Sequence, residues 1–200
     1  GSMSLAHRIE KAKHFGIWLH EKTNNRRYPN GIREQTGLSI LQLTLDIGDA
    51  IVVLLEAKVP GPALSLSRPL LEGYVRGFWL LNRASDKQVD NFLNGKCPKF
   101  PGLLAAIGKD PKSGGAWIHA MTEKNLLAFH DLTHGGCEHV RRRIGDDSVE
   151  PSYPEDELDA LVKIGIEIRI RIGAELLSRL KDEEAIGQLN EMARAFRQEP

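Results

Sequence analysis

Arg68 and Glu72 are the two side chains whose types and spacing most directly suggest chemistry. They lie four residues apart within residues 64–79, LSLSRPLLEGYVRGFW, so a helix places both on one face, among its apolar residues. Burying either charge without its partner costs about 3 to 5 kcal/mol, so the two groups must pair with each other or serve a site. We predict that this helix contributes a guanidinium and a carboxylate to a polar cluster in the core, with Arg76 as a further cation.

His130 and His134 form a second candidate group, in the sequence FHDLTHGGCEHVRRR. Their i, i+4 spacing puts both imidazoles on one helix face, as a metal pair or an acid–base pair requires. HDLTH lacks the glutamate of the HExxH metalloprotease pattern, and a third ligand would have to come from Glu72, Asp49 or His139. We therefore expect no metal and no other cofactor, and we expect His134 to meet a core carboxylate.

Three consecutive arginines, Arg141, Arg142 and Arg143, follow the histidines. Such a cluster can bind phosphates through charge-assisted, partly bidentate hydrogen bonds. Acidic residues come directly after it, at positions 146, 147 and 150, so the alternative is a solvated run that is neutralised within its own loop.

The composition indicates one globular domain without a strong net electrostatic field. Its 200 residues are 41% hydrophobic and 27% charged, which fits a single domain with a sizeable core. The 27 basic and 27 acidic residues cancel, so any nucleic-acid role must rest on a local site. Cys97 and Cys137 form no CxxC motif, which favours reduced thiols in a cytoplasmic protein.

The ends of the sequence and its apolar runs bear on targeting and domain limits. We find no signal-peptide pattern and no apolar run that approaches the roughly 20 residues of a membrane span, so we expect no membrane partner. Gly1 and Ser2, ahead of Met3, resemble a cloning remnant, which leaves one expected domain over residues 4–197.

Hydrophobic periodicity predicts an all-α fold. Helices are expected over residues 5–22, 33–58, 64–79, 87–93 and 117–133, with a short continuation through HVRRRI and a last long helix from residue 154. Proline and glycine make residues 94–116 loop-rich. These elements predict an up-and-down bundle of about five to seven helices.

The last long segment carries a conflict between two patterns. Isoleucine occupies every second position over residues 163–172, which is typical of a strand. The same residues also form a helical stripe, and no second strand is available to pair with them, which favours the helix. In that helix Arg169 faces the core, as Asp49 does within residues 33–58.

The order of motifs along the chain resembles that of a group of uncharacterised bacterial helical proteins. The motifs are SRPLLEGYVRGFWLLNRASD, then LTHGG about fifty residues later, a basic stretch and EPSYPEDEL, within residues 38–176. The group is distantly similar to the HEPN superfamily of helical bundles, which includes ribonuclease toxins and phage-defence effectors. The resemblance implies an HEPN-like bundle, and the residues that match the group's motifs are Arg68, Glu72, Arg76 and His134.

An RNA-directed role follows from the resemblance together with the inward polar residues. HEPN ribonucleases pair an Arg with a His four to six residues away near a dimer interface, a spacing that this chain shows only at Arg8 and His14. We expect a metal-independent, ribonuclease-like effector in phage defence or toxin–antitoxin function, with His134 as general acid or base, Arg68 stabilising the phosphate and Glu72 orienting one of them. The expected substrate-binding residues are Arg76, His130, Arg141, Arg142 and Arg143.

Two alternatives stay open. In the first, the protein is a non-catalytic dimeric module for binding or assembly, and Arg68 and Glu72 only cross-link helices. In the second, His130, His134 and Glu72 hold a metal in a hydrolase. We expect a homodimer, although no residue pattern indicates which face would form it.

Overall fold

Regular structure in the computed structural model, which describes residues 3–110, 117–118 and 137–200, is helical apart from one isolated bridge between Ile144 and Val149. Five helices are long: α1 (Leu5–Thr23), α2 (Ile32–Glu56), α4 (Ser67–Asn82), α9 (Glu155–Leu180) and α10 (Glu183–Gln198). Four are short: α3 (Pro60–Ser65), α5 (Asp86–Leu93), α6 (Phe100–Gly108) and α8 (Cys137–Arg141).

The all-α prediction is confirmed for the described residues, with differences in detail. They hold more helices than the expected five to seven. Leu66 separates α3 from α4, α10 follows α9 as a separate helix after Lys181 and Asp182, and α6 forms within residues 94–116, expected to be loop-rich. Pro101 lies in the first turn of α6, where a missing backbone N–H costs nothing. The HEPN-like character of the bundle stays a prediction.

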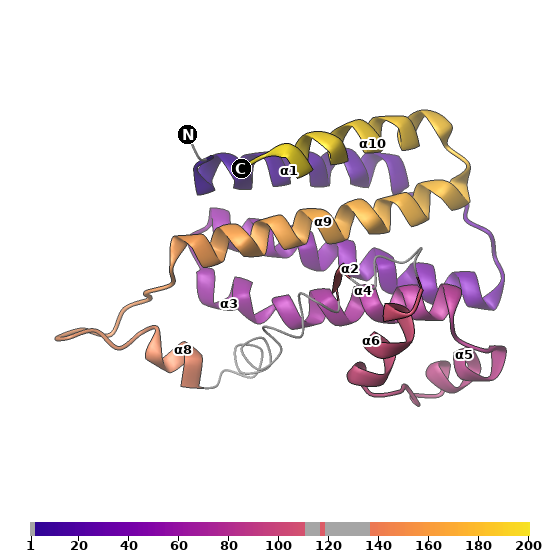
Figure 1. Cartoon of the computed structure of the whole chain (residues 1–200), viewed down its shortest axis with the longest axis horizontal. Coiled ribbons are helices and arrows are strands. Elements are labelled where there is room, and N and C mark those ends of the chain that lie inside the picture. Colours follow the sequence, from indigo (N-terminus) through magenta and orange to yellow (C-terminus); the bar gives the residue numbers. More distant parts are fainter. Residues whose placement is uncertain (1–2, 111–116, 119–136) are drawn as a thin grey trace.

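Helix α9 is the centre of the molecule. It lies between α1 and α10 on one side and α2 and α4 on the other (Figure 1), and it contacts each of these four helices. Ile166, Ile168, Ile170 and Ile172 are all buried, although they point in different directions around the helix. The alternating isoleucines therefore reflect a helix that is covered on most sides rather than a strand.

Local sequence sets the helix ends. Ser4 caps α1 by accepting a hydrogen bond from the His7 backbone N–H at 3.2 Å, and Ser85 forms a capping box with Gln88 at the start of α5. Helix α9 has three acidic residues in its first turn and ends at Lys181 in the left-handed conformation, with φ of 56°.

Helices α2 and α4 approach each other through glycines. A Cβ on Gly77 would lie 2.4 Å from Leu41 Cδ2 and 3.3 Å from the Gly37 carbonyl oxygen. A Cβ on Gly37 would meet Leu81 at 2.5 Å, so each helix needs a residue without a side chain at this crossing.

Helix α2 is, within the described ranges, the one helix that is long and apolar enough to cross a membrane by length and composition. This corrects the expectation that no segment approaches such a span. Length and apolarity of this kind also suit a helix that is packed on several sides, and α2 packs against α1, α4 and α9.

Candidate functional site

The predicted pair on α4 forms, and it extends to a third residue. Arg68 Nε lies 2.6 Å from Glu72 Oε1, and Arg76 Nη1 lies 3.4 Å from Glu72 Oε2. The Arg68 guanidinium also covers the ring of Phe100 in α6, at 4.4 Å from the ring centre. The side chains of Arg68 and Glu72 are 14% and 23% exposed, so the cluster lies at the edge of the core rather than sealed inside it.

Two histidines, His130 and His134, are expected to complete this cluster. His130 and His134 lie outside the described residues, so the proposed meeting of His134 with Arg68 and Glu72, and the metal alternative on the same histidines, stay predictions. Arg76 Nε is buried without a hydrogen-bond partner among the residues that the structure describes.

The three consecutive arginines differ in how far their charges are neutralised. Arg141 pairs with Glu138 at 3.1 Å, and Arg142 pairs with both Glu138 and Glu157. Within the described part of the chain, Arg143 makes no ion pair. Its guanidinium carbon instead lies 5.9 Å from the ring centre of Tyr153.

A chain of hydrogen bonds that the sequence did not suggest runs beside Arg143. Ser65 Oγ lies 2.9 Å from His139 Nε2, and His139 Nδ1 lies 2.8 Å from the Tyr153 hydroxyl. The three residues come from α3, α8 and the segment ahead of α9. The imidazole is thereby oriented through both of its nitrogens, as the base of a catalytic site must be.

Gly61 allows these groups to come together. A Cβ at this position would lie 2.8 Å from the Tyr153 hydroxyl oxygen and 3.1 Å from Arg143 Nη2. The same glycine borders a cavity of about 510 Å³, and a ligand in the cavity would meet His139, Ser65 and Arg143 together. The lining residues are Leu54, Gly61, Pro62, Ser65, Leu66, His139 and Arg143.

Two tautomers of His139 fit the hydrogen bonds. Ser65 Oγ also lies 3.1 Å from the Gly61 carbonyl oxygen, and when the hydroxyl donates there, Nε2–H donates to Ser65 Oγ. In the other tautomer Nδ1–H donates to the Tyr153 oxygen, and Nε2 accepts a hydrogen bond from the Ser65 hydroxyl. The second arrangement is the one that a general base uses.

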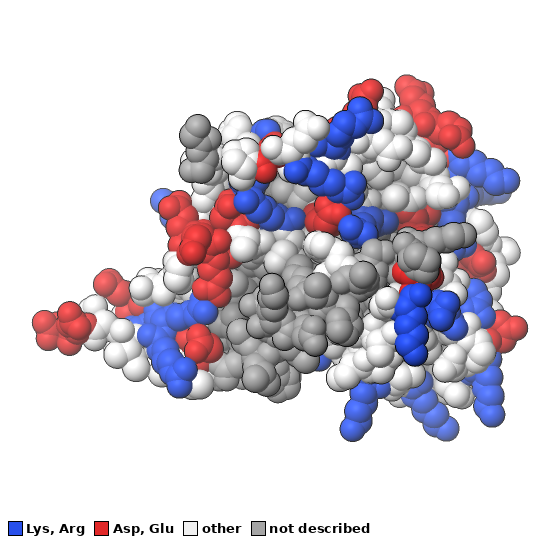
Figure 2. All heavy atoms as spheres, viewed as in Figure 1, with Lys and Arg blue, Asp and Glu red and all other residues white. Residues whose placement is uncertain are grey.

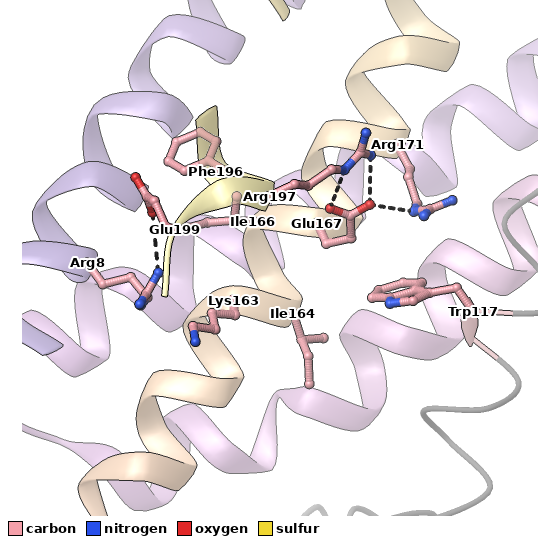
Figure 3. Close-up of a pocket in the computed structure, with 10 residues that line it drawn as sticks. All are labelled: Arg8, Trp117, Lys163, Ile164, Ile166, Glu167, Arg171, Phe196, Arg197 and Glu199. Atoms are coloured by element: carbon pink, nitrogen blue, oxygen red, sulfur yellow. Dashed lines mark hydrogen bonds and ion pairs between the residues drawn. The ribbon is translucent and has the colours of Figure 1, made fainter. Parts of the chain in front are cut away.

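A second cavity, of about 520 Å³, lies where the end of α10 meets α1 and α9. Figure 3 shows its side chains: cations from α1, α9 and α10, two carboxylates, and the aromatic rings of Trp117 and Phe196. Glu167 binds two guanidiniums, that of Arg171 at 3.0 Å and that of Arg197 at 2.8 Å. The Arg171 guanidinium lies over the ring of Trp117, at 4.8 Å from its centre.

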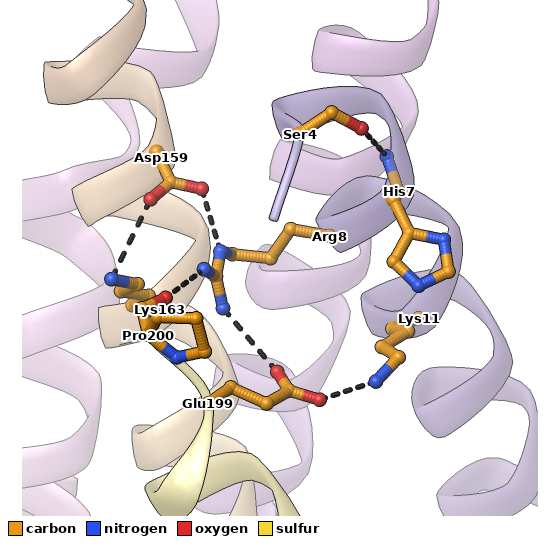
Figure 4. Close-up of polar contacts among 8 residues, drawn as sticks. All are labelled: Ser4, His7, Arg8, Lys11, Asp159, Lys163, Glu199 and Pro200. Atoms are coloured by element: carbon orange, nitrogen blue, oxygen red, sulfur yellow. Dashed lines mark hydrogen bonds and ion pairs between the residues drawn. The ribbon is translucent and has the colours of Figure 1, made fainter. Parts of the chain in front are cut away.

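Arg8, at the α1 side of this cavity, is a buried cation with three acceptors. Its guanidinium binds Asp159 at 2.6 Å, Glu199 at 3.3 Å and the Pro200 carbonyl oxygen at 2.7 Å (Figure 4). Lys163 also approaches Asp159, at 3.6 Å. These contacts join α1, α9 and the segment after α10.

A third polar group, Arg169 with Asp49, lies where α1, α2 and α9 meet. Arg169 Nη1 donates to Asp49 Oδ1 at 2.9 Å, and Nη2 donates to the Ala12 carbonyl oxygen at 3.3 Å. Burial lowers the pKa of Arg169, while Asp49 opposes this shift; burial likewise raises the pKa of Asp49, and Arg169 opposes it. The two inward charges expected on separate helices thus neutralise each other.

In this helical protein, Ser65, His139 and Tyr153 are half buried and joined by hydrogen bonds, and they lie beside the Arg143 guanidinium. The chain belongs to the DUF6988 family, a family of unknown function, whose match covers residues 41–199. No curated protein and no solved structure matches the chain.

Sequence reasoning missed Ser65 and Tyr153, and it considered His139 only as a possible metal ligand. Ser65 and His139 are 74 positions apart, and His139 and Tyr153 are 14 apart, so no local motif joins them. The available signals were Tyr153 between two prolines and His139 next to the arginines.

Proposed function

We propose that the chain binds RNA at the cavity of Ser65, His139 and Arg143 and cleaves it without a metal. The observation that carries this proposal is the position of Arg143, a guanidinium without a described carboxylate partner, beside an imidazole held through both nitrogens. A guanidinium stabilises phosphate charge, and an oriented imidazole moves protons. His139 and Arg143 thus take the roles that the sequence suggested for His134 and Arg68.

The proposed reaction uses the ribose hydroxyl as nucleophile. His139 Nε2 takes the proton of the 2′-hydroxyl, whose oxygen attacks the adjacent phosphorus. The bond from phosphorus to the 5′-oxygen breaks, that oxygen takes a proton from solvent, and a 2′,3′-cyclic phosphate forms. Arg143 stabilises the charge that gathers on the phosphate oxygens. In the free protein the Ser65 hydroxyl occupies the place of the 2′-hydroxyl.

Cleavage of a labelled RNA in the presence of EDTA tests the proposal. We expect His139→Gln and Arg143→Gln each to lower the rate by about 100-fold or more, the usual effect of losing a general base or a charge-stabilising group. Arg27→Gln is the matched control, because Arg27 is an exposed arginine outside this cavity, and its rate should stay close to that of the parent.

Further substrates and variants distinguish this mechanism from the alternatives. An RNA with a single 2′-deoxy sugar at the cleavage site should resist, and Ser65→Ala should still cleave, because the substrate provides the nucleophile. A His134→Ala protein that loses activity while His139→Gln keeps it would return the catalytic role to His134. A parent protein that leaves RNA intact would remove the proposal, together with the defence or toxin–antitoxin role that the HEPN resemblance implies.

A dimeric assembly module is a second candidate, favoured by one face of α2. Ile32, Leu43 and Val53 are 61%, 56% and 63% exposed, although the helix is otherwise a core element. At 100° per residue they lie within about 80° of one another, and we assign this face, which also carries the exposed Ser39 and Asp46, to a second copy of the chain.

A further inference from the structure

We propose that the cavity between α1, α9 and α10 binds the monophosphate of a nucleotide, with the base against its aromatic wall. This site is separate from the cavity of Ser65, His139 and Arg143, and it does not depend on RNA cleavage. It is built from described residues of three helices and Trp117, and each of its carboxylates is already shared between cations.

The charges of this cavity leave an excess of positive charge. Arg8, Lys163, Arg171 and Arg197 line it, against Glu167 and Glu199. Asp159 adds a third carboxylate, but it is shared by Arg8 and Lys163, while Glu199 is shared by Arg8 and Lys11. With Lys11 and Asp159 included, the side chains of the group are five cations and three carboxylates, so a bound phosphate monoester would meet an excess of positive charge.

Two of the cations are exposed, and one of them is placed to receive a phosphate. The side chains of Lys163 and Arg197 are 46% and 53% exposed, whereas Arg8 is 3% exposed and committed to its partners. Figure 2 shows basic side chains gathered over α9 and α10, interrupted by acidic ones. Lys163 would therefore hold the phosphate, with Arg8 fixing the position of Glu199 behind it, whereas Arg197 lies apart from Lys163, beside Glu167 and Arg171 (Figure 3).

The apolar part of the cavity fits a flat ring. Ile164 lies between Lys163 and Trp117 in Figure 3, and Phe196 faces the cavity from α10. The guanidinium of Arg171 over Trp117 fixes that ring, so a base can stack in the cavity without first ordering its wall. A phosphate near Lys163 with a base toward Ile164 and Trp117 uses both the charged and the apolar part of the cavity.

Calorimetric titration with AMP, adenosine and inorganic phosphate tests this site. It should use the His139→Gln protein, so that cleavage cannot interfere and a failure of the proposed RNA activity leaves this result intact. We expect AMP to bind about tenfold or more tightly than adenosine or phosphate, because one charge-assisted contact is worth about a factor of ten. Lys163→Gln should weaken AMP binding about tenfold.

Arg194→Gln is the matched control, since Arg194 is an exposed arginine of α10 outside the cavity, and its AMP affinity should not change. Trp117→Phe should keep most of the affinity and Trp117→Ala should lose it. The same titration with RNA oligomers distinguishes the two sources of the phosphate. An oligomer with a 5′-phosphate that binds more tightly than AMP and than its 5′-hydroxyl counterpart would assign the site to an RNA end rather than to a free nucleotide. Equal affinity for AMP and adenosine, no measurable AMP binding, or a Lys163→Gln protein that matches Arg194→Gln would overturn the proposal.

Discussion

Arg169 is surrounded by protein on every side, yet its partner keeps access to water. The side chain of Arg169 is 1% exposed and that of Asp49 is 42% exposed. Two glycines make room for the guanidinium: a Cβ on Gly16 would lie 2.7 Å from Arg169 Nη1, and a Cβ on Gly48 would lie 2.7 Å from Arg169 Cδ. The two members of this ion pair therefore differ in what their removal leaves behind.

We predict that Asp49→Ala destabilises the protein more than Arg169→Met does. The first change leaves a fully buried cation without its carboxylate and should cost about 3 kcal/mol, in the range of broken buried pairs. The second leaves a carboxylate that water can reach, and it should cost about 1 kcal/mol because Met fills much of the space. Urea denaturation of both variants measures the difference. Equal losses, or a larger loss for Arg169→Met, would contradict the asymmetry.

Single residues also show what the sequence could and could not foretell. Helical periodicity placed Arg169 inward and Arg68 next to Glu72, because both inferences need only spacing along one helix. Periodicity could not say that Arg169 would pair with Asp49, which is 120 positions away. Periodicity could not predict the contacts among Ser65, His139 and Tyr153 for the same reason, since they depend on how α3 and α8 pack together.

At the scale of elements, the α2–α4 crossing depends on missing side chains. We predict that Gly77→Ala lowers the free energy of unfolding by about 1 to 3 kcal/mol, because its Cβ would push into Leu41 and toward the Gly37 backbone. Gly187→Ala in α10 is the control: a Cβ there meets nothing within 4 Å, so alanine should stabilise the protein by about 0.5 to 1 kcal/mol. Chemical denaturation distinguishes the two, and a stabilised Gly77→Ala protein would show that the crossing can adjust.

Helix type was easier to predict than helix limits. The alternation of isoleucine over residues 163–172 suggested a strand, and it belongs to a helix because α9 is covered from several directions. The proline and glycine of residues 94–116 suggested loops, yet Pro101 and the apolar FPGLLAAIG allow α6. Composition alone cannot tell a proline that ends a helix from one in its first turn.

For the whole molecule, the exposed apolar residues of α2 predict self-association. The parent protein should elute in light-scattering chromatography with the mass of a dimer, and Leu43→Glu combined with Val53→Glu should elute as a monomer. Ile144→Glu is the control, since Ile144 is 65% exposed but lies near the turn after α8, and it should leave the dimer unchanged. A monomeric parent at high concentration would exclude the α2 face as an interface between copies.

The contacts of α1 determine where the protein can be truncated for expression. The family match begins at residue 41, but Arg8 and the Ala12 carbonyl of α1 satisfy Asp159, Glu199 and the guanidinium of Arg169. A fragment trimmed to the matched region would remove at least one partner from each of these three buried or half-buried charges and would expose the face of α9 under Phe15 and Leu19. Expression boundaries for this protein should therefore include the nineteen residues of α1, whatever the limits of sequence similarity suggest.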